Sequence, residues 1–380
     1  MQFERIGNIV KIVSGGTPSR GISEYWGGKI PWVKISDMIS RYVDKTEEYI
    51  TEEGLNNSAT KILPKGTLLI SIFATVGRTA ILGLNASTNQ AIVGLIPKSK
   101  DIDIQFLKYV LDSEIESLKY RSRGVAQNNI NTSILSDIKI PLPSLEEQKQ
   151  IAHILDKADA LRQKRKQSIQ LLDDYLKSVF YNMFGDPVIN NKKWNLAKFS
   201  DVGTLDRGRS KHRPRNAPHL LGGKYPLIQT GDIANSKGYI RFFSQTYSDE
   251  GLKQSKMWKK GTLCITIAAN IAKTGILTFD ACFTDSVVGF IPNSKTNVEY
   301  IQYWLSYLQK RLEDTAPESA QKNINLEILR KLIVPIPPIS LQNQFANIFE
   351  QVEQTKSKME ESLKEIDNLF NSLMNKFFGK

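Results

Sequence analysis

The sequence predicts an α+β fold in which two similar globular α/β domains are joined by two long antiparallel coiled-coil helices, with a pseudo-two-fold internal repeat. Three observations predict this fold. Residues 144–185 carry apolar side chains at alternating spacings of four and three, which is the period of a coiled coil. The same pattern returns in residues 338–380. The stretches before the two helices, residues 1–143 and 186–337, share short motifs in the same order.

Residues 144–185 also carry the start and stop signals of a single helix. Ser144 and Glu147 have the spacing of a capping box, and Gly185 followed by Pro187 ends a helical pattern. A helix of this length spans about 60 Å at about 1.5 Å per residue, which exceeds one wall of a compact domain. We therefore interpret it as a spacer.

Neither helix can bury its apolar stripe alone, so we expect each to cover the other. Arg162 and Arg165 occupy positions of this seam where apolar residues are expected. They either meet acidic residues of a partner or reach past the seam to solvent, and both interpretations stay open. The residues expected to pair the helices are Ile151, Ala158, Ile169, Leu172, Leu176 and Val179 in the first and Phe345, Val352, Leu363, Ile366, Phe370 and Leu373 in the second.

The internal repeat is the strongest signal in the sequence. Residues 27–29 (Gly-Gly-Lys) return as residues 222–224, and residues 65–68 (Lys-Gly-Thr-Leu) return as residues 260–263. Between such shared motifs the two copies differ. This pattern favours one scaffold that reads two different ligands, and ordinary drift of surface loops is the alternative.

Each copy begins with strands and ends with a helix. Runs rich in β-branched residues at 67–73 and 91–96, bounded by glycine, predict strands. The proline-rich joints at 141–143 and 335–338 are expected to end the sheets, because proline cannot continue a strand ladder, and to lead into the long helices. The other helices are expected at residues 104–120 and 298–312.

The net charge of +12 suggests a polyanion as a partner. The excess lies in the globular parts, because residues 1–143 hold 17 basic and 14 acidic residues and residues 186–337 hold 22 and 13. The two long helices are nearly neutral. Many unrelated proteins are equally basic, so the charge alone does not identify the partner.

The sequence has no window with the roughly 18 consecutive apolar residues of a membrane span, and its N-terminal residues lack the sections of a signal peptide. We therefore expect a cytoplasmic protein that does not contact membranes. Cys264 and Cys282 lie far apart in the chain and form no CxxC motif. Two buried thiols are expected rather than a disulfide or a zinc site.

The motifs of common catalytic sites are missing from the sequence. It contains no Walker A sequence, no paired HxH or HExxH, no NPPY-type methylase tetrapeptide and no G-x-S-x-G elbow. Residues 222–224 come nearest to a Walker A sequence but lack its upstream glycine and its following Ser or Thr. We expect no catalytic residue, no metal ligand and no catalysis by this chain alone.

A series of motifs runs through the chain. They are GGTPSR at 15–20, YWGGKIPWV at 25–33, LPKGTLLIS at 63–71, NQAIVGLIP at 89–97 and PLPSLEEQKQIAHIL at 141–155. Together with the duplication, this series resembles the specificity subunit of type I restriction-modification enzymes over essentially the whole chain. The resemblance implies target-recognition domains at 1–143 and 186–337 and conserved spacer helices at 144–185 and 338–380. Each domain would read one half of a bipartite double-stranded DNA target, and the helices would fix the spacer between the halves.

The resemblance also implies partners and cofactors. The paired helices would recruit two methyltransferase subunits, and restriction/translocase subunits would complete the complex. S-adenosylmethionine, ATP and Mg would be used by those partners, and no cofactor would be bound by this chain. The alternative function is a non-catalytic scaffold that binds RNA or another polyanion.

Direct reading of bases needs hydrogen-bonding side chains, with Arg or Lys suited to guanine and Asn or Gln to adenine. The candidate DNA-binding residues of the first copy are Thr17, Ser19, Arg20, Arg78, Asn89, Gln90, Arg121, Arg123, Gln127 and Asn128. Those of the second copy are Arg207, Arg209, Lys211, Arg213, Arg215, Asn270, Lys273, Gln321 and Lys322. An extended segment at 207–215 would put its five basic side chains on one side.

Several of these candidates have a structural alternative. Asn89 and Gln90 precede a predicted strand, where their role is equally well explained by closing a turn. For the basic series at 207–215 we favour a flank that binds phosphates over a base reader. Asn131 and Asn325 lie just before the final proline joint of each copy, and we expect them to be structural caps rather than DNA contacts.

Overall fold

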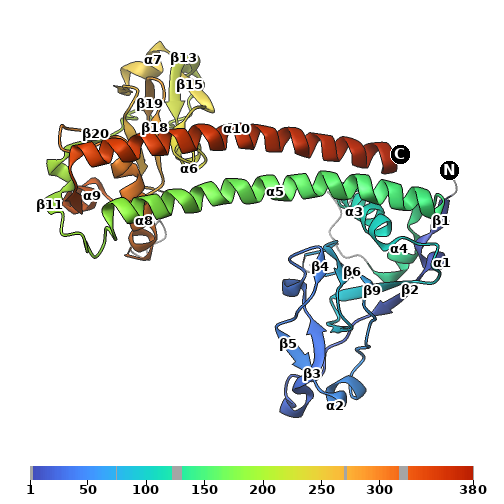
Figure 1. Cartoon of the computed structure of the whole chain (residues 1–380). Coiled ribbons are helices and arrows are strands. Elements are labelled where there is room, and N and C mark those ends of the chain that lie inside the picture. The colour runs from blue at the N-terminus through green and yellow to red at the C-terminus, as the bar shows by residue number, and fades with distance from the viewer. Residues whose placement is uncertain (1–2, 74, 122–130, 269–271, 316–323, 380) are drawn as a thin grey trace. The chain divides into compact units, whose positions relative to one another are not determined.

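The computed structural model describes residues 3–73, 75–121, 131–268, 272–315 and 324–379. For the helical residues 116–121 and 310–315 it describes the backbone and not the side chains. The chain divides into two compact units (Figure 1). The N-terminal unit comprises residues 1–165 and 362–380, and the C-terminal unit comprises residues 166–361. Each of the two long helices therefore supplies one segment to each unit.

The described residues of the N-terminal unit form three sheets. Its strands are β1 (Phe3–Arg5), β2 (Val10–Ser14), β3 (Trp26–Val33), β4 (Tyr42–Val43), β5 (Glu48–Ile50), β6 (Leu68–Ser71), β7 (Thr79–Leu82), β8 (Ser87–Thr88), β9 (Ile92–Pro97) and β10 (Lys139–Pro141). One sheet has the order β2-β9-β6-β7-β4, a second has the order β5-β3-β8, and β1 pairs with β10. Its helices are α1 (Ile6–Ile9), α2 (Glu52–Asn56), α3 (Ile104–Arg121) and α4 (Thr132–Asp137), with 3-10 turns η1 (Ser23–Tyr25) and η2 (Ile35–Asp37).

The C-terminal unit repeats this arrangement. Its strands are β11 (Asn195–Lys198), β12 (Gly203–Arg207), β13 (Leu221–Ile228), β14 (Tyr239–Ile240), β15 (Gln245–Tyr247), β16 (Met257–Trp258), β17 (Leu263–Thr266), β18 (Thr274–Leu277), β19 (Ala281–Phe283), β20 (Val287–Pro292) and β21 (Ile333–Ile336). The sheets have the orders β12-β20-β17-β18-β14, β15-β13-β19-β16 and β11-β21. Its helices are α6 (Thr230–Ala234), α7 (Asp249–Lys253), α8 (Val298–Thr315) and α9 (Leu326–Lys331), with 3-10 turns η3 (Phe199–Asp201) and η4 (Pro218–Leu220).

The two copies share their strand pairing down to single irregularities. In each five-stranded sheet the last pair is parallel (β4 with β7, β14 with β18) and the other pairs are antiparallel. The long strands β3 and β13 both carry a register shift just before the shared proline. The repeated Gly-Gly-Lys motif supplies it, since Gly27 and Gly222 have φ of +77° and +79°. The predicted α+β fold with two similar domains is confirmed.

One of the two proline-rich joints differs from the expectation. Pro141 is the last residue of β10, and Pro335 lies inside β21, opposite Leu196 of β11. The expectation that the joints end the sheets holds for the first joint, where β10 stops at Pro141, and is wrong for the second, where β21 continues through Pro335 to Ile336. Both strands belong to two-stranded sheets. Every strand there is an edge, so a proline nitrogen can face away from its neighbour without costing a ladder hydrogen bond.

The long helices are α5 (Leu145–Phe184) and α10 (Ile339–Phe378). At the start of α5 the Glu147 N–H donates to the Ser144 hydroxyl oxygen (3.3 Å), which is one half of the predicted capping box. At its end Gly185 takes φ +78°, and its N–H donates to the Tyr181 carbonyl (2.8 Å). Gly379 follows α10 with the matching hydrogen bond, since its N–H donates to the Asn375 carbonyl (2.8 Å), but it lacks the positive φ of Gly185.

A buried glutamine ties the first turn of each long helix to the globular part of its unit. Gln148 and Gln342 each accept one backbone N–H and donate to two carbonyl oxygens, over distances of 2.8 to 3.1 Å. The partners are Asp101, Asp103 and Pro143 for Gln148, and Lys295, Asn297 and Pro337 for Gln342. The start of each helix is thereby fixed by backbone groups rather than by packing alone.

Within each unit a segment of α5 packs beside a segment of α10 in the opposite direction (Figure 1). In the C-terminal unit, Phe180 of α5 and Phe345 of α10 have ring centroids 5.4 Å apart. In the N-terminal unit, Phe378 of α10 meets Phe106 of α3 at 5.7 Å. Of the proposed pairing residues, the buried ones are Ile151, Ala158, Leu176, Phe345 and Val352 and the partly buried ones are Ile169, Leu172, Val179, Leu363, Ile366, Phe370 and Leu373.

Both cysteines are free and buried, as predicted. Burial raises the pKa of the Cys264 thiol far above its usual value, and it raises that of Cys282 as well. A neutral, enclosed thiol is a poor nucleophile and a poor metal ligand. These residues therefore serve as small apolar groups inside the core of the C-terminal unit.

Candidate nucleic-acid interface

In the N-terminal unit, the loop that follows β2 (residues 15–20, the first entry loop) lies against the turn between β8 and β9. The Gly15 N–H donates to the Ile92 carbonyl (3.0 Å). A Cβ atom at Gly15 would lie 2.1 Å from the Asn89 carbonyl oxygen, so glycine is required for this approach. Backbone contacts therefore bring the two loops together.

Two side chains of the first entry loop have fixed partners. The Thr17 hydroxyl donates to the Gln90 amide oxygen. The Arg20 guanidinium stacks on Trp26, 3.8 Å from a ring centroid, and donates to the Glu48 carboxylate (2.5 Å). This hydrogen bond lowers the pKa of Glu48 below its usual value, so the carboxylate stays charged. Arg20 is exposed but oriented by β3 and β5.

The turn before β9 combines a structural and an exposed amide. The Ala91 N–H donates to the Asn89 side-chain oxygen (3.1 Å), and the Ile92 N–H donates to the Asn89 carbonyl (3.1 Å). Asn89 therefore closes a turn, which is the structural alternative for this residue. Gln90 is exposed and meets Thr17, and Ser19 is exposed in the same loop. The Ser19 carbonyl accepts the Trp26 indole N–H (3.1 Å), and this hydrogen bond ties the end of the first entry loop to β3.

The C-terminal unit builds the same junction without the GGTPSR motif. The loop after β12 (residues 208–215, the second entry loop) begins with Gly208, whose N–H donates to the Val287 carbonyl (2.9 Å). A Cβ atom at Gly208 would lie 2.3 Å from the Thr284 carbonyl oxygen. Gly208 is therefore structurally equivalent to Gly15, and the turn between β19 and β20 is equivalent to the turn between β8 and β9.

Basic side chains gather around a single carboxylate at this second junction. The Arg207 side chain donates to the Asp285 carbonyl (2.9 Å). The Asp285 carboxylate pairs with Arg215 (2.6 Å) and with Arg213 (3.4 Å). Asp285 lies 195 residues after Gln90, which is the offset of the repeat. The same position therefore holds an amide in one unit and an acid with arginine partners in the other.

The basic series at 207–215 is not one extended segment. Strand β12 ends at Arg207, and the chain bends and turns from residue 212 to residue 216. Arg213 folds back so that its guanidinium donates to the Ser210 carbonyl (2.5 Å). The expectation that an extended backbone aligns all five side chains therefore fails beyond Lys211, because the backbone changes direction there. Arg209 and Lys211 are exposed, as are the other three.

Arg78 and Lys273 occupy matching hairpin turns rather than the entry loops. Each follows a strand of the five-stranded sheet, and its carbonyl accepts an N–H from that strand, from Ser71 in one unit and Thr266 in the other (both 2.9 Å). The Arg78 guanidinium donates to the Ile35 carbonyl (3.2 Å). The Lys273 side chain lines a cavity of about 370 Å³ beside the C-terminal unit's segments of α5 and α10.

Part of the predicted set lies outside the described residues. These candidates are Arg123, Gln127, Asn128, Asn270, Gln321 and Lys322, together with the side chain of Arg121. The predicted caps are confirmed: the Asn131 side-chain oxygen accepts the Ile134 N–H, and that of Asn325 accepts the Ile328 N–H, both at 2.8 Å. They start α4 and α9.

Arg162, which left two interpretations open, meets acidic residues of this chain. Its guanidinium donates to Asp367 of α10 (2.7 Å) and to Asp159 one turn earlier on α5 (3.3 Å). It also lies 4.3 Å from the ring centroid of Phe370. Arg165 is partly buried on the same helix. The charge in the seam is therefore balanced from the opposite helix, within the N-terminal unit.

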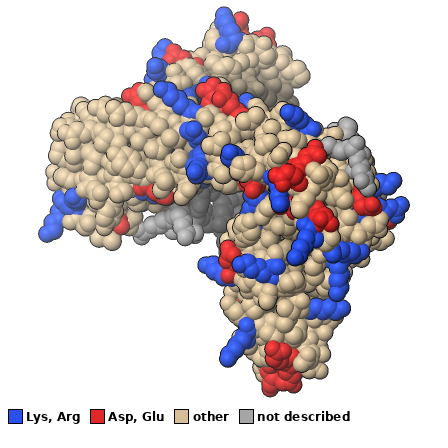
Figure 2. Space-filling model, turned by 45° about the vertical axis from the view of Figure 1, so that its right-hand side comes forward, with Lys and Arg blue, Asp and Glu red and all other residues tan. Residues whose placement is uncertain are grey.

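On the face that Figure 2 shows, surface charge alone does not locate a binding site. On the face shown in Figure 2, Lys and Arg are interspersed with Asp and Glu rather than gathered in one basic patch. Among the residues that the structure describes, no three His, Cys, Asp or Glu side chains are placed to hold a metal ion. Within that same part of the chain, no helix is long and apolar enough to cross a membrane. Because surface charge on that face does not single out a site, the entry loops are identified as the candidate interface by their geometry.

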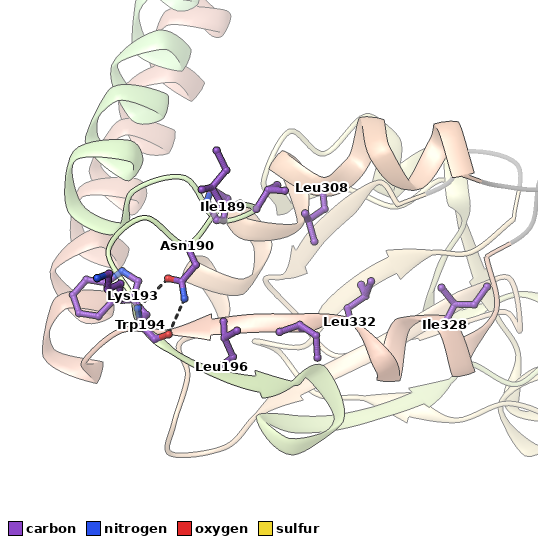
Figure 3. A pocket seen from close by; sticks show the side chains of 11 residues that line it. Ile189, Asn190, Lys193, Trp194, Leu196, Leu308, Ile328 and Leu332 are labelled. Carbon is purple, nitrogen blue, oxygen red and sulfur yellow. Dashed lines mark hydrogen bonds between the residues drawn. The ribbon is translucent and has the colours of Figure 1, made fainter.

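The C-terminal unit also exposes an apolar pocket of about 720 Å³ (Figure 3). Its walls come from the segment after α5, from β11 and β21, and from α8 and α9. The segment is held in shape by Asn190, whose side chain bonds the Trp194 backbone twice (2.8 and 3.0 Å). Leu196, Leu308 and Leu332 line the pocket with mainly aliphatic neighbours. This composition suits an apolar partner rather than nucleic acid.

Sequence reasoning missed several residues of these sites. Trp26 and Glu48 orient Arg20, and Asp285 gathers the arginines, yet none was a candidate. The repeat offset points to one of the missed positions, because Asp285 lies 195 residues after Gln90, whereas Gly208 lies 193 residues after Gly15 and is matched to it by the structure. No sequence signal links Arg20 with Glu48, because that contact depends on the pairing of β3 with β5.

Comparison with protein families gives a match along most of the chain. The family model described as the type I restriction modification DNA specificity domain matches residues 1–171 and matches again at residues 191–368. The first match begins with the first copy of the repeat, and the second begins five residues into the second copy, at residue 191 rather than 186. They include the entry loops, the sheets and most of both long helices.

Comparison with characterised proteins finds specificity subunits. The MjaIX subunit of Methanocaldococcus jannaschii is 29% identical over 274 residues, a match that covers 67% of this chain and 62% of that protein. The EcoR124I/EcoR124II subunit of Escherichia coli is 33% identical over 168 residues, covering 42% and 41%. The matched part thus spans less than two thirds of these two proteins. The MjaVIII subunit is 26% identical, and that match covers 96% of this chain and 90% of that subunit.

Solved structures share the fold. The type I restriction-modification S subunit from M. genitalium superposes with a TM-score of 0.60 at 16% identity, over 100% of this chain and 96% of that one. A chain from a structure of type I complex assembly gives a TM-score of 0.55 at 17% identity, over 99% and 97%. At such identities the likeness concerns the fold, with its two α/β domains and long paired helices.

Proposed function

The chain belongs to the type I restriction-modification DNA specificity family, and from this premise we propose that it reads a bipartite duplex DNA target. In this proposal residues 1–143 and 186–337 are the two target-recognition domains, and each reads one half of the target. Residues 144–185 and 338–380 are the spacer helices that fix the number of base pairs between the halves. The family is non-catalytic, so cleavage and methyl transfer belong to partner subunits.

One observation carries the proposal: the same two loops meet in each unit but with different chemistry. In the N-terminal unit the pair is Thr17 with Gln90, beside Arg20 on Trp26. In the C-terminal unit it is Arg213 and Arg215 with Asp285. A shared backbone frame with exchanged hydrogen-bonding groups is what two different base sequences require. Drift of surface loops does not explain why the glycine-dependent junction is kept in both copies.

The partners and cofactors follow from the family. In this proposal two methyltransferase subunits bind, one for each copy of the repeat, and restriction/translocase subunits join them. These partners use S-adenosylmethionine, ATP and Mg, and this chain binds none of them. Acting on the cell's DNA places the complex in the cytoplasm. The duplication supports two copies of one partner, because equivalent surfaces occur once in each unit.

A deletion in both long helices tests the spacer. Removing residues 163–169 from α5 and 357–363 from α10 takes one heptad from each helix between the ion pairs of Arg162 and Lys356, which both stay in place. A heptad is about 10.5 Å of helix, so the preferred spacer is expected to shorten by about three base pairs of about 3.4 Å each. The measurement is sequencing of methylated sites in cells that express the variant with its methyltransferase partner.

The matched control keeps the length and changes the sequence. Replacing the same fourteen residues by other helix-forming residues with the same heptad pattern is expected to leave the spacer unchanged. An unchanged spacer in the deletion variant, with both half-targets still methylated, would contradict the ruler role. Loss of methylation at all sites would be followed by a check of helix content, to separate unfolding from loss of recognition.

A further inference from the structure

The C-terminal unit contains a buried ion cluster between the long helices. Lys356 of α10 is only 7% exposed, and its ammonium pairs with Glu353 on the same helix (2.8 Å) and with Asp173 of α5 (2.6 Å). Burial alone lowers the pKa of Lys356, but the two carboxylates raise it above its usual value, so the amine stays charged. Glu353 is 5% exposed, so the Lys356–Glu353 pair is shielded from water and salt, whereas the Asp173 side chain is 41% exposed.

The cluster has a counterpart in the N-terminal unit at the offset of the repeat. Lys356 corresponds to Arg162, Glu353 to Asp159 and Asp173 to Asp367, each 194 residues apart. Each triad thus has one basic residue, an acidic residue three positions earlier on the same helix and an acidic residue on the opposite helix. We call them the N-terminal triad and the C-terminal triad.

Both triads fall in one and the same antiparallel register. Arg162 and Asp173 are eleven residues apart on α5, and their partners Asp367 and Lys356 are eleven residues apart on α10. Eleven residues are about three helical turns, so both charged positions of each helix lie on nearly the same face. Any sliding of α10 along α5 would break both cross-helix ion pairs at once.

The apolar seam by itself tolerates sliding. Its residues repeat every seven positions, so a shift of one heptad again puts apolar side chains opposite apolar side chains. A shift would take Asp173 away from Lys356 and leave the buried ammonium with Glu353 as its remaining acidic partner of this triad, and removing one partner from a buried ion network is unfavourable. A polar group placed in an apolar seam is a known way in which coiled coils select one register.

We propose that the two triads select the register of α5 against α10 and thereby set the spacer length of the DNA target. The first part concerns this chain alone. The second part rests on the proposed function, because register matters for the target only if the helices act as the ruler. The triad residues are in this sense specificity-determining residues that contact no base.

The test replaces both triads by apolar residues of similar size. The variant carries Asp159→Leu, Arg162→Leu, Asp173→Leu, Glu353→Leu, Lys356→Met and Asp367→Leu. Such replacements usually preserve or increase stability, so the helices are expected to stay folded and paired. Nitroxide labels on cysteines placed at the exposed positions Leu161 and Leu369 report the register, since both lie in the N-terminal unit and the native cysteines are buried.

Pulsed electron paramagnetic resonance then measures the distance between the labels. The unsubstituted protein is expected to give one narrow distance. The apolar variant is expected to give a broad distribution with components displaced along the helices by about 10 Å, the length of a heptad. One unchanged, narrow distance in the variant would overturn the proposal. The control D174L/K177L removes an exposed ion pair confined to α5 and is expected to change nothing.

A second variant guards against misfolding, and a second readout tests the target. D173N/D367N removes the negative charges of the two ion pairs between α5 and α10 and keeps the side-chain volume. It is expected to broaden the distance distribution as the apolar variant does. Methylation of DNA by the full complex is then compared for the native spacer and for spacers changed by three base pairs. The ratio of the two rates is expected to fall to about one in the apolar variant. A shifted register with an unchanged spacer preference would instead reject the ruler and leave the register role standing.

Discussion

At the scale of single residues, the candidate interface depends on glycines as much as on polar side chains. Gly15 and Gly208 allow the entry loops to touch the backbone of the neighbouring turn, and the polar residues are then presented at the junction. A polar side chain reads a base only if its position is fixed before the DNA arrives. The orientation of Arg20 by Trp26 and Glu48 is an example of such preorganisation.

Substituting the junction glycine tests this dependence. Gly15→Ala places a methyl group 2.1 Å from a carbonyl oxygen, so the two loops must move apart. We expect the free energy of unfolding to fall by about 1–3 kcal/mol, and we expect methylation of targets to lose selectivity in one half-site only. The measurements are urea denaturation and sequencing of methylated sites. Gly21→Ala is the matched control, because its new methyl group meets nothing closer than 3.9 Å.

At the scale of elements, the two-stranded sheets and short helices next to the long helices expose apolar side chains in both units. Leu196 of β11 is 58% exposed, and Phe3 of β1 is 51% exposed at the matching position. Ile328 of α9 and Ile134 of α4 form a second matching exposed pair. Exposed apolar side chains at equivalent places in both copies are typical of surfaces that bind other proteins.

We therefore predict that this surface contributes to methyltransferase binding. Leu196→Asp with Ile333→Asp puts two charges on the pocket of Figure 3. The double variant is expected to bind the methyltransferase subunit at least about tenfold more weakly, since hot-spot substitutions cost about 2 kcal/mol or more. Calorimetry with purified subunits measures this. I39D/F242D charges two other exposed residues, each 83% exposed, and is the control. Equal affinities for both double variants would contradict the assignment.

At the scale of the whole molecule, a duplicated chain shares its two long helices between its two units. The excess positive charge is unevenly divided, with +9 of the net +12 in residues 186–337. Charge that contacts phosphates strengthens binding to any sequence, whereas base readers discriminate between sequences. The two roles therefore separate in how binding depends on salt.

The exposed residues Arg209 and Lys211 distinguish these roles. If they contact phosphates, as favoured above, R209Q/K211Q is expected to lower the slope of log affinity against log salt by about two units, about 0.9 per contact, without changing which target is preferred. Fluorescence anisotropy with duplex targets at several salt concentrations measures the slope. K149Q/K358Q removes two exposed charges from the long helices and is the charge-matched control. An altered target preference with an unchanged slope would make these residues base readers.

The elements could be predicted from the chain alone because their signals are local or periodic. The heptad spacing, the Ser144 start and the Gly185 end located α5 to within one residue, and the constant offset of the repeat predicted two similar domains. Asn131 and Asn325 were identified as caps for the same reason, since a cap acts three residues away. The second proline joint misled, because an edge strand tolerates a proline that an inner strand does not. The basic series at 207–215 misled as well, because its backbone bends and turns from residue 212.

Contacts between distant residues were decided by the tertiary structure. Arg162 and Asp367 are 205 positions apart, and the local sequence around each residue does not predict that the two side chains meet. The same holds for Arg20 with Glu48 and for Arg215 with Asp285. A periodic pattern states which face of an element is apolar, but the partner of each charge depends on the register in which the elements pack. The chain by itself determined the repeat and its helices, and packing decided which charges meet.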